Sequence, residues 1–446
     1  MADPKRVSLI SLGCVKNVVD SEKMLGQFAQ AGCVIAGEED AEVLVINTCG
    51  FLSAAREEAD EVIADALQRK AEGLVSRVVV VGCLVQRDKE AILDRLPAVD
   101  AIVGVHNRDD VVRAVLGTSS TASQPAPDVF LGDYHPHTQS DTARLRITPR
   151  HYAYLRISEG CDHRCTFCTI PAIRGPMHCK PPEAILSEAH ELVSDGAVEI
   201  HLIGQDTTSY GLAGDGFDGG LAKLLRQLDR VDGLAWIRLM YAYPTALSDD
   251  IIAAIADCEH VCKYVDVPLQ HISDRVLKAM GRRTSRAETE RLLHKLRDRI
   301  PDVTIRTTLI AGFPGETQEE FDELLQFVGD FGFDALGVFG YSSEPDTPSG
   351  AMENQLSADT IQQRADALML AQQENAFRLA RQRVGGTGVV LVDERLEDGI
   401  VVGRHEGQAP DVDSLTYIED CTATPGTFVK VRYTAQDDYD LKATPT

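Results

Sequence analysis

Three cysteines in the middle of the chain are spaced as C-x3-C-x2-C. They are Cys161, Cys165 and Cys168, here called the central triad, and they follow an apolar run that predicts a β-strand. Three thiolates can hold three irons of a [4Fe–4S] cluster and leave the fourth open to chelate the amino and carboxylate groups of S-adenosylmethionine (SAM). One electron would then break the sulfonium and yield a 5′-deoxyadenosyl radical. The spacing therefore predicts a radical-generating cluster that uses SAM.

Other metal sites fit the central triad less well. A ferredoxin-type cluster needs a fourth nearby cysteine and a shorter spacing, and a structural zinc site needs a second pair of ligands. Cys179 is the spare cysteine nearby. Three cysteines that are simply buried or bind zinc are the plain alternative, but this spacing directly after a strand favours cluster ligation.

A second set of three cysteines is spread over the first part of the chain. Cys14, Cys49 and Cys83, here called the N-terminal triad, each follow a strand-like run, and each lies next to a glycine. Parallel strands of an open sheet end side by side, so the three thiols can converge. Any one of them alone could be an ordinary buried cysteine. Three at equivalent strand ends favour a second, auxiliary cluster.

Residues near the central triad and at other predicted strand ends could contact cofactor or substrate. The candidates are Phe167, Gln205, Asp206, Gly312 and Gly315 for the cofactor, and Gln270 and His271 for the substrate. Phe167 lies between two triad cysteines, and the Gly/Pro turn at Gly312 lets backbone approach a ligand closely. Each has a simpler alternative. Phe167 could be plain core, Gln205 and Asp206 could cap a loop, and the histidine could be structural.

The elements that position these residues predict an α/β protein. Residues 1–116 alternate strand and helix, which implies an open parallel sheet. The strands are expected at 7–12, 43–46 and 78–81, and a helix at 53–71. Residues 117–147 are rich in Ser, Thr, Pro, Asp and His and predict a linker.

Residues 148–376 repeat strand then helix six times. The strands are expected at 154–158, 198–204, 236–241, 264–269, 304–311 and 335–341, with helices at 181–195, 220–230, 248–257, 273–280, 285–299 and 316–330. Six units are too few for a closed eight-stranded barrel but suit an open partial (βα)6 barrel, with its chemistry at the C-terminal strand ends. A helix at 357–383 leads out of it.

Residues 377–446 are expected to form a small C-terminal domain. Five short β-like runs are expected at 388–392, 400–404, 415–418, 427–433 and 439–443. Several short strands with turns between them favour a small antiparallel, OB-like β-barrel.

The composition narrows the class of protein. Of the 446 residues, 44% are hydrophobic and 25% are charged, and no apolar run reaches the roughly 18 residues that a membrane span needs. Eleven cysteines without an export signal favour metal ligation over disulfides, so we expect a cytoplasmic protein with no membrane partner. The net charge of -25 disfavours a general nucleic-acid binder.

Taken together, the motifs resemble the methylthiotransferase family of radical SAM enzymes. The resemblance covers nearly the whole chain except the linker. It rests on 11–17 (SLGCVKN), 47–51 (NTCGF), 82–83 (GC), the central triad, 268–271 (PLQH) and 312–317 (GFPGET). The stretch from Leu12 to Glu22 looks most like the branch that modifies an aspartate of small-subunit ribosomal protein twelve.

The resemblance implies two [4Fe–4S] clusters with separate tasks. The central triad would hold the radical-generating cluster, and the N-terminal triad would hold an auxiliary cluster at which sulfur is methylated and delivered. One SAM molecule would supply the radical and a second the methyl group. The C-terminal barrel would be a TRAM-type substrate-recognition module. The implied partners are ribosomal protein twelve and an electron donor such as flavodoxin or ferredoxin, and the sulfur donor stays open.

Two positions depart from the family pattern. Val15 stands where the family commonly has proline, and Cys179-Lys180 stand where a Ser-Arg pair is usual. A lysine lacks the bidentate fork that an arginine would offer a cofactor.

The charge of the last 63 residues bears on the substrate. Residues 384–446 hold 12 acidic and 5 basic side chains, a net charge of −7. Such a field opposes transfer RNA and attracts a basic ribosomal protein, although it could also serve solubility alone. A methylthiotransferase for transfer RNA would share both triads but should carry a basic C-terminal module. An iron–sulfur electron carrier would need neither the open iron nor the partial barrel.

Overall fold

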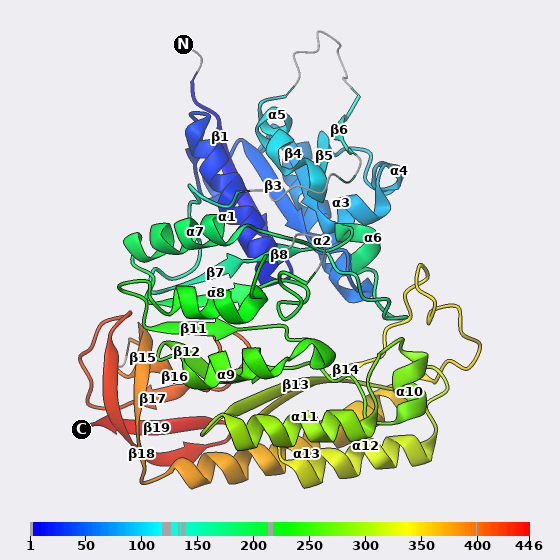
Figure 1. Ribbon diagram of the computed structural model, residues 1–446. Helices are drawn as coiled ribbons and strands as arrows, with labels where there is room; N and C mark the ends of the chain where they lie inside the picture. The colour runs from blue at the N-terminus through cyan, green and yellow to red at the C-terminus, as the bar shows by residue number, and fades with distance from the viewer. Residues whose placement is uncertain (1–2, 118–125, 133, 135–139, 213–216, 398) are drawn as a thin grey trace. The chain divides into compact units, whose positions relative to one another are not determined.

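The computed structural model of the protein describes residues 3–117, 126–132, 134, 140–212, 217–397 and 399–446 (Figure 1). They divide into two compact units. The first comprises residues 1–147, 158–163 and 168–178, and the second comprises 148–157, 164–167 and 179–446. The chain therefore crosses between the units within the loop that holds the central triad.

The first unit is built on a six-stranded parallel sheet. Its strands are β1 (Arg6–Ser11), β2 (Val34–Ile35), β3 (Val43–Thr48), β4 (Arg77–Gly82), β5 (Ala101–Gly104) and β6 (Asp128–Phe130), in the order β2-β1-β3-β4-β5-β6. Its helices are α1 (Val15–Gln30), α2 (Ser53–Ala71), α3 (Cys83–Asp88), α4 (Ala91–Arg95), α5 (Val111–Leu116) and α6 (Ile170–Arg174), with 3-10 turns at Glu38–Asp40 and Val105–Asp110. The predicted open parallel sheet is confirmed.

The sequence of the strands explains why helices cover both faces of this sheet. Along β3, Val43 and Val45 belong to one buried apolar cluster, and Leu44 and Ile46 belong to another. Helices α1 and α5 contribute to the first cluster, and α2, α3 and α4 contribute to the second. Successive side chains of a strand point to opposite faces, so a continuous apolar run needs cover on both.

The segment predicted as a linker is partly built into the first unit. Its residues 128–130 form β6, which extends the sheet beside β5. The Arg108 guanidinium lies 2.7 Å from the Asp141 carboxylate, and the Lys23 ammonium donates to Thr142 O at 2.7 Å. These contacts join residues far apart in the chain, so the polar composition of the segment did not reveal them.

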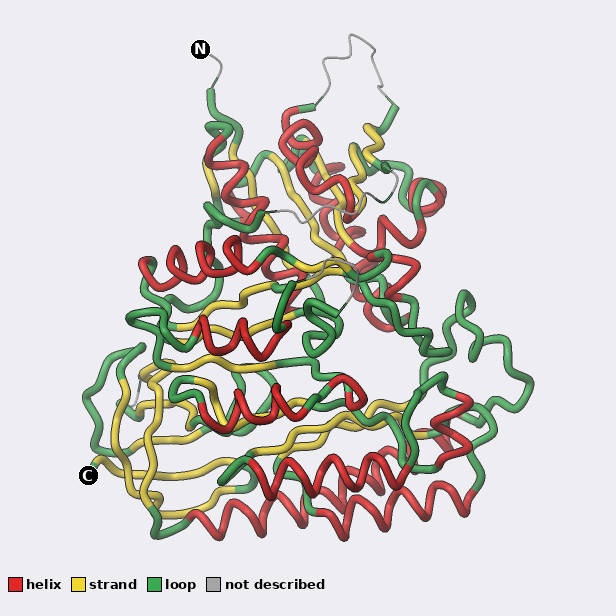
Figure 2. Tube along the Cα trace, in the orientation of Figure 1, coloured by secondary structure: helices red, strands yellow, loops and turns green. Residues whose placement is uncertain are grey.

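The second unit contains a second six-stranded parallel sheet, as predicted. Its strands are β7 (Tyr152–Arg156), β10 (Glu199–Ile203), β11 (Trp236–Leu239), β12 (Val261–Asp266), β13 (Thr304–Ala311) and β14 (Ala335–Gly340), in chain order across the sheet. Helices α7 (Pro182–Ser194), α8 (Gly220–Leu228), α9 (Asp249–Asp257), α10 (Asp274–Ala279), α11 (Arg286–Arg299) and α12 (Gln318–Phe331) alternate with them, along with a 3-10 turn at Pro244–Ala246 (Figure 2). Two short strands, β8 (Ser158–Glu159) and β9 (His178–Cys179), flank the central loop and α6 in the sequence.

A closed five-stranded barrel completes the second unit. Its strands are β15 (Thr387–Arg395), β16 (Val401–His405), β17 (Thr416–Ile418), β18 (Phe428–Asp437) and β19 (Asp440–Pro445), in the order β15-β16-β17-β19-β18. Helix α13 (Ala358–Arg383) leads into it, so the boundary expected at residue 377 falls inside a helix. No helix in the described ranges is long and apolar enough to cross a membrane.

Candidate metal centres and cofactor site

The cysteines of the N-terminal triad follow three neighbouring strands. Cys14 comes after β1, Cys49 after β3 and Cys83 after β4, and these strands are adjacent in the sheet. Cys14 is the residue before α1, and Cys83 is the first residue of α3. The strand order thus brings the three turns to one edge of the sheet, as the sequence predicts.

Glycines show how closely the three turns approach one another. Gly13 has a φ of +87°, and a Cβ there would lie 2.7 Å from the Cβ of Cys49 and 3.3 Å from its Sγ. A Cβ at Gly50 would lie 2.8 Å from backbone atoms of Cys83. Real Cβ atoms essentially never come within 3.0 Å of another heavy atom. Each turn therefore needs glycine where the next turn touches it.

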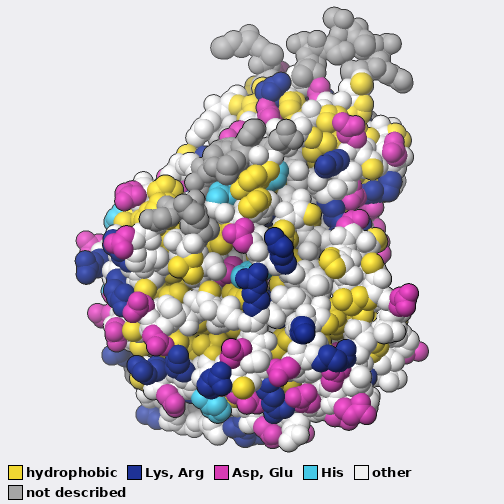
Figure 3. Space-filling view, turned by 45° about the vertical axis from the view of Figure 1, so that its right-hand side comes forward, with side chains coloured by type: hydrophobic (Ala, Val, Ile, Leu, Met, Phe, Trp, Pro, Cys, Tyr) yellow, Lys and Arg dark blue, Asp and Glu magenta, His cyan; other side chains and the backbone are white. Residues whose placement is uncertain are grey.

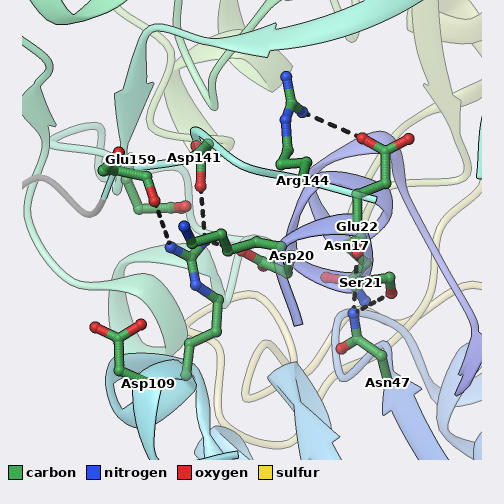
Figure 4. A network of polar contacts seen from close by, with 12 residues as sticks. Asn17, Asp20, Ser21, Glu22, Asn47, Asp109, Asp141, Arg144 and Glu159 are labelled. Carbon is green, nitrogen blue, oxygen red and sulfur yellow. Dashed lines mark hydrogen bonds and ion pairs between the residues drawn. The ribbon is translucent and has the colours of Figure 1, made fainter. Parts of the chain in front are cut away.

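Two buried asparagines hold these turns in place (Figure 4). The Asn17 side-chain amide donates to Leu12 O at 2.9 Å and to Thr48 O at 3.0 Å, which ties the end of β1 to the end of β3. The Asn47 amide in turn donates to Asn17 O at 2.9 Å. A buried side-chain amide whose N–H groups are hydrogen-bonded to backbone oxygens holds that backbone in one conformation.

Two thiols of the N-terminal triad have raised pKa values, which makes them poor free nucleophiles. Burial raises the pKa of Cys83 to about 12, an effect that the guanidinium of Arg174 partly offsets. Burial also raises the pKa of Cys49. Such thiols hold their protons at neutral pH, and a metal ion takes the place of the proton when it binds.

The donor set fits a cluster rather than a single ion. No three Cys, His, Asp or Glu side chains in the part of the chain that the structure describes are close enough to hold one metal ion. The thiolates of a [4Fe–4S] cluster bind different irons, so they are spaced more widely than the ligands of one ion. Three thiols on neighbouring glycine-containing turns match that need.

The central triad lies in the loop between β8 and α6. Within the first unit, the Cys161 N–H donates to Gly175 O at 3.1 Å. Within the second unit, a Cβ at Gly281 would lie 2.5 Å from Arg164 O, so this part of the loop packs tightly on the turn after α10. All three triad cysteines are partly exposed. The loop is thus anchored by its backbone, and its three cysteines remain partly exposed.

An arginine faces one cysteine of the central triad. The Arg282 guanidinium lies 3.7 Å from the Cys165 Sγ and 4.3 Å above the ring of Tyr243. It also donates to Pro268 O. The contacts hold a positive charge beside a candidate cluster ligand.

The predicted Gly/Pro turn packs next to Phe167. Phe167 contacts the apolar cluster that contains Phe313. Gly312 and Gly315 have φ values of +78° and +76°, which favour glycine. The fully buried Glu316 carboxylate accepts from the Gly312 N–H at 2.9 Å and the Phe313 N–H at 3.3 Å. Glu316 therefore braces the turn from inside.

The two polar candidates after β10 differ in their surroundings. The buried Asp206 carboxylate accepts from the Thr208 hydroxyl at 2.6 Å and from the Ser209 N–H at 3.1 Å. These contacts fit the loop-capping alternative, and cofactor contact stays a prediction for Asp206. Gln205 is partly exposed and stays a candidate for cofactor contact.

The two substrate candidates after β12 also differ. Gln270 has a φ of +74° and is partly exposed, and its N–H donates to Thr308 O at 2.8 Å. His271 is fully buried, its Nδ1 accepts from the Ser273 N–H at 3.0 Å, and its Nε2 lies 3.5 Å from Glu316. A ring without exposed surface does not reach a substrate in this conformation. Its burial favours the structural alternative for His271, and substrate contact stays a prediction.

The unusual Cys179-Lys180 pair is internal. The Lys180 ammonium donates to both carboxylate oxygens of Glu188, at 2.8 and 2.6 Å, and only 1% of the residue is exposed. The Tyr210 hydroxyl donates to Lys180 O at 2.7 Å. Cys179 is buried as well. Lys180 thus forms a buried ion pair with Glu188.

The C-terminal barrel docks at the opposite end of the strands from the candidate cofactor residues (Figure 1). Glu199, the first residue of β10, is fully buried and lies 2.9 Å from Arg238 of β11 and 2.8 Å from Arg404 of β16. Burial alone would raise the pKa of Glu199, but the two arginines hold it well below its usual 4.5. One buried carboxylate thus joins the sheet to the barrel.

Further acidic side chains of the barrel face the same interface. The Asp413 carboxylate accepts from the Tyr264 hydroxyl at 2.7 Å and lies 3.4 Å from Arg306. Asp393 lies 2.8 Å from His151. Part of the −7 net charge counted in the sequence therefore serves docking. On the face drawn in Figure 3, acidic and basic side chains are interspersed.

We predict that Glu199→Gln strongly destabilises the second unit. The variant keeps the shape but leaves Arg238 buried without its carboxylate, which should cost about 3–5 kcal/mol of unfolding free energy. Because the folded-state pKa of Glu199 is lowered, its contribution is present above the unfolded value of 4.5 and is lost as pH falls below it. Urea unfolding of the protein at pH 7 and pH 4 measures both effects.

Lys295→Ala is the matched control, because Lys295 pairs with Asp249 on the surface at 2.8 Å. Its unfolding midpoint should match that of the unaltered protein. Equal stability of Glu199→Gln and the control would show that the buried network does not hold the barrel.

The sequence reasoning missed the polar residues that surround the triads. Asn17 and Arg174 lie within seven residues of a triad cysteine, and that proximity was a usable signal. Arg282 carries no such signal, because it lies 117 residues from Cys165 in the sequence. Glu199 gave no signal beyond a charged residue at the start of an apolar strand.

Sequence profiles match the three parts of the chain. The radical SAM superfamily matches residues 155–328, the uncharacterized protein family UPF0004 matches residues 6–104, and the TRAM domain matches residues 384–445.

The chain is similar over nearly its whole length to curated proteins that carry one name. Each is named "Ribosomal protein uS12 methylthiotransferase RimO". The protein of Pelobacter propionicus is 42% identical over 98% of this chain and 97% of its own. Those of Geobacter sulfurreducens and Anaeromyxobacter sp. (strain K) are 41% and 43% identical, over 98% of this chain and 98% and 92% of theirs.

Solved structures of other radical SAM enzymes share the fold. The methyltransferase TsrM from Kitasatospora setae, with tryptophan and a SAM analogue bound, has a TM-score of 0.57 at 15% identity and covers 86% of this chain and 78% of its own. The cobalamin-dependent enzyme OxsB has a TM-score of 0.51 at 12% identity, covering 82% and 56%. At these identities the likeness concerns architecture alone.

Proposed function

Since this chain belongs to the RimO family of radical SAM methylthiotransferases, we propose that it adds a methylthio group to the β-carbon of an aspartate in ribosomal protein uS12, small-subunit ribosomal protein twelve. The observation that carries the proposal is the adjacency of the Cys14, Cys49 and Cys83 turns in a chain that also has the central triad.

We infer that each triad holds one [4Fe–4S] cluster, the central triad for radical generation and the N-terminal triad for sulfur delivery. When bound, the clusters and two SAM molecules supply the radical, the methyl group and the site at which sulfur is methylated. Phe167, Gln205, Asp206, Gly312 and Gly315 would line the SAM site.

The chain's own residues position and shield these groups. An aspartyl β-carbon has no acidity that a side chain could exploit, so general acid–base catalysis does not account for its modification. The protein must instead hold the reacting groups close together and away from water. Within the second unit, the turn at Gly312 is braced by Glu316, and within the first unit, Asn17 ties the turns of the N-terminal triad together, so each unit would hold its own groups rigidly.

The partners follow from this activity. The enzyme would work in the cytoplasm, where the ribosome is, and would take electrons from a donor such as flavodoxin or ferredoxin. Residues 1–116, 148–376 and 377–446 would serve as the auxiliary-cluster domain, the radical SAM core and the TRAM domain.

A transfer RNA substrate is the second candidate, and charge disfavours it. RNA binding relies on Lys and Arg contacts to phosphates, and the C-terminal module holds 5 basic against 12 acidic side chains. Ribosomal proteins are commonly basic because they bind RNA, so an acidic module would attract one.

We predict that the reconstituted enzyme modifies uS12 and leaves unmodified transfer RNA unchanged. Both substrates are offered under the same reducing conditions with SAM, and mass spectrometry locates any methylthio group. Added salt should lower the rate with uS12, because screening weakens the attraction between the acidic enzyme and a basic substrate. Modification of an adenosine, with none in the protein, would contradict the proposal.

A further inference from the structure

Arg174 lies close in the sequence to the central triad and contacts Cys83 of the N-terminal triad. It is the last residue of α6, a helix that starts two residues after Cys168 of the central triad. Its guanidinium donates to the Cys83 Sγ at 3.2 Å, so the short helix leads from one set of candidate ligands to the other. Both ends of this path lie in the first unit.

The guanidinium is buried and held by three further groups, whose side chains Figure 4 labels as Glu159, Asn17 and Asp20. It donates to the Glu159 carboxylate at 2.9 Å, to the Asn17 side-chain oxygen at 2.8 Å and to the Asp20 carboxylate at 3.2 Å. Only 2% of the residue is exposed. Although burial opposes its charge, the neighbouring Cys83, Glu159 and Asp20 raise the pKa of Arg174, so it stays a cation.

A second buried arginine provides the comparison. Arg108 lies 3.2 Å from the other oxygen of Asp20 and 2.7 Å from Asp141. It is 4% exposed, nearly as buried as Arg174. Its guanidinium donates to oxygen atoms of Asp20, Asp141 and Ser140, whereas that of Arg174 also donates to a sulfur. The two arginines thus share a carboxylate and differ in the contact with Cys83.

We propose that Arg174 is a positioning residue that tunes the auxiliary cluster, by donating an N–H to the Cys83 sulfur and by placing a fixed positive charge beside it. This inference rests on the proposed function, which assigns Cys83 to that cluster. Hydrogen bonds to cluster sulfurs and nearby charge are among the factors that set the reduction potential of iron–sulfur clusters.

The sign of the effect follows from electrostatics. Reduction adds one negative charge to the cluster, and a nearby cation stabilises the reduced form. The interaction is strong because Arg174 is buried in a medium of low dielectric constant. Loss of the cation should therefore shift the midpoint potential to more negative values. Lysine would keep the charge but lose the planar fork that serves Cys83, Asn17 and Glu159 together.

The test uses the full-length protein in which the central triad is replaced by alanine, so that the auxiliary cluster is observed alone. Arg174→Met, Arg174→Lys and the control Arg108→Met are made in this background. Iron content and redox titration followed by electron paramagnetic resonance are measured for each. The expected order of midpoint potentials is parent, then Arg174→Lys, then Arg174→Met as the most negative, with Arg108→Met close to the parent.

The other outcomes overturn the proposal. An unchanged potential in Arg174→Met, or an equal shift in Arg108→Met, would remove the special role of the Cys83 contact. Loss of the cluster in both Arg174 variants but not in Arg108→Met would make Arg174 a structural requirement only. If the parent itself binds no iron, the proposed function fails at its cluster assignment, and the inference fails with it.

Discussion

Replacing Cys161, Cys165 and Cys168 by alanine should lower the iron content from about eight to about four per chain and abolish SAM cleavage. The three thiolates are needed to keep one iron open for SAM, and the described loop is otherwise held by its backbone. Iron analysis after anaerobic reconstitution and chromatographic assay of 5′-deoxyadenosine measure the two effects.

The control for this variant removes three other sulfurs. Cys258, Cys262 and Cys421 are buried and lie outside both triads. Their joint replacement by alanine should leave the iron content at the level of the unaltered protein, since buried free cysteines act as small apolar side chains. Full iron content in the central-triad variant would show that these cysteines are not cluster ligands.

Replacing Cys14, Cys49 and Cys83 by alanine should separate the two activities. The variant should still form 5′-deoxyadenosine at a rate near that of the unaltered protein, because radical generation needs only the cluster of the central triad. It should form no methylthiolated uS12, because sulfur delivery is assigned to the missing cluster. Mass spectrometry of uS12 and assay of 5′-deoxyadenosine are run on the same reaction.

The folded state of that variant must be checked, since Gly13 and Gly50 pack against the replaced side chains and backbone. Circular dichroism and the elution volume should match those of the unaltered protein. Loss of 5′-deoxyadenosine together with product, in a variant that passes this check, would contradict the division of labour between the clusters.

The sequence was sufficient for features that depend on local pattern. The apolar runs before Cys14, Cys49 and Cys83 predicted three parallel strands, and strands that end side by side bring their following turns together. The strand at Thr304–Ala311 and the helix at Ser53–Ala71 have the predicted bounds, because alternation and helical periodicity are properties of neighbouring residues.

Features that depend on distant partners were out of reach. A histidine after a strand gives no sign of whether it faces a ligand or a buried carboxylate, and His271 lies beside Glu316. Arg174 likewise shows its role only when folding places it on Cys83, 91 residues away in the sequence. In the same way, β6 forms in a polar segment because β5 offers it a free edge.

The buried ion pairs between the second sheet and the C-terminal barrel bear on whether the barrel can be removed from the chain. By sequence, the C-terminal barrel is an appended domain that one could remove at residue 384. In the structure the barrel covers the end of the sheet at which β10 begins, and its Arg404 lies 2.8 Å from Glu199. Truncation would expose that end of the sheet to water. It would also remove Arg404, one of the two arginines that pair with the buried Glu199 carboxylate. We therefore expect the radical SAM sheet and the barrel to unfold together, and removal of the barrel to destabilise the sheet.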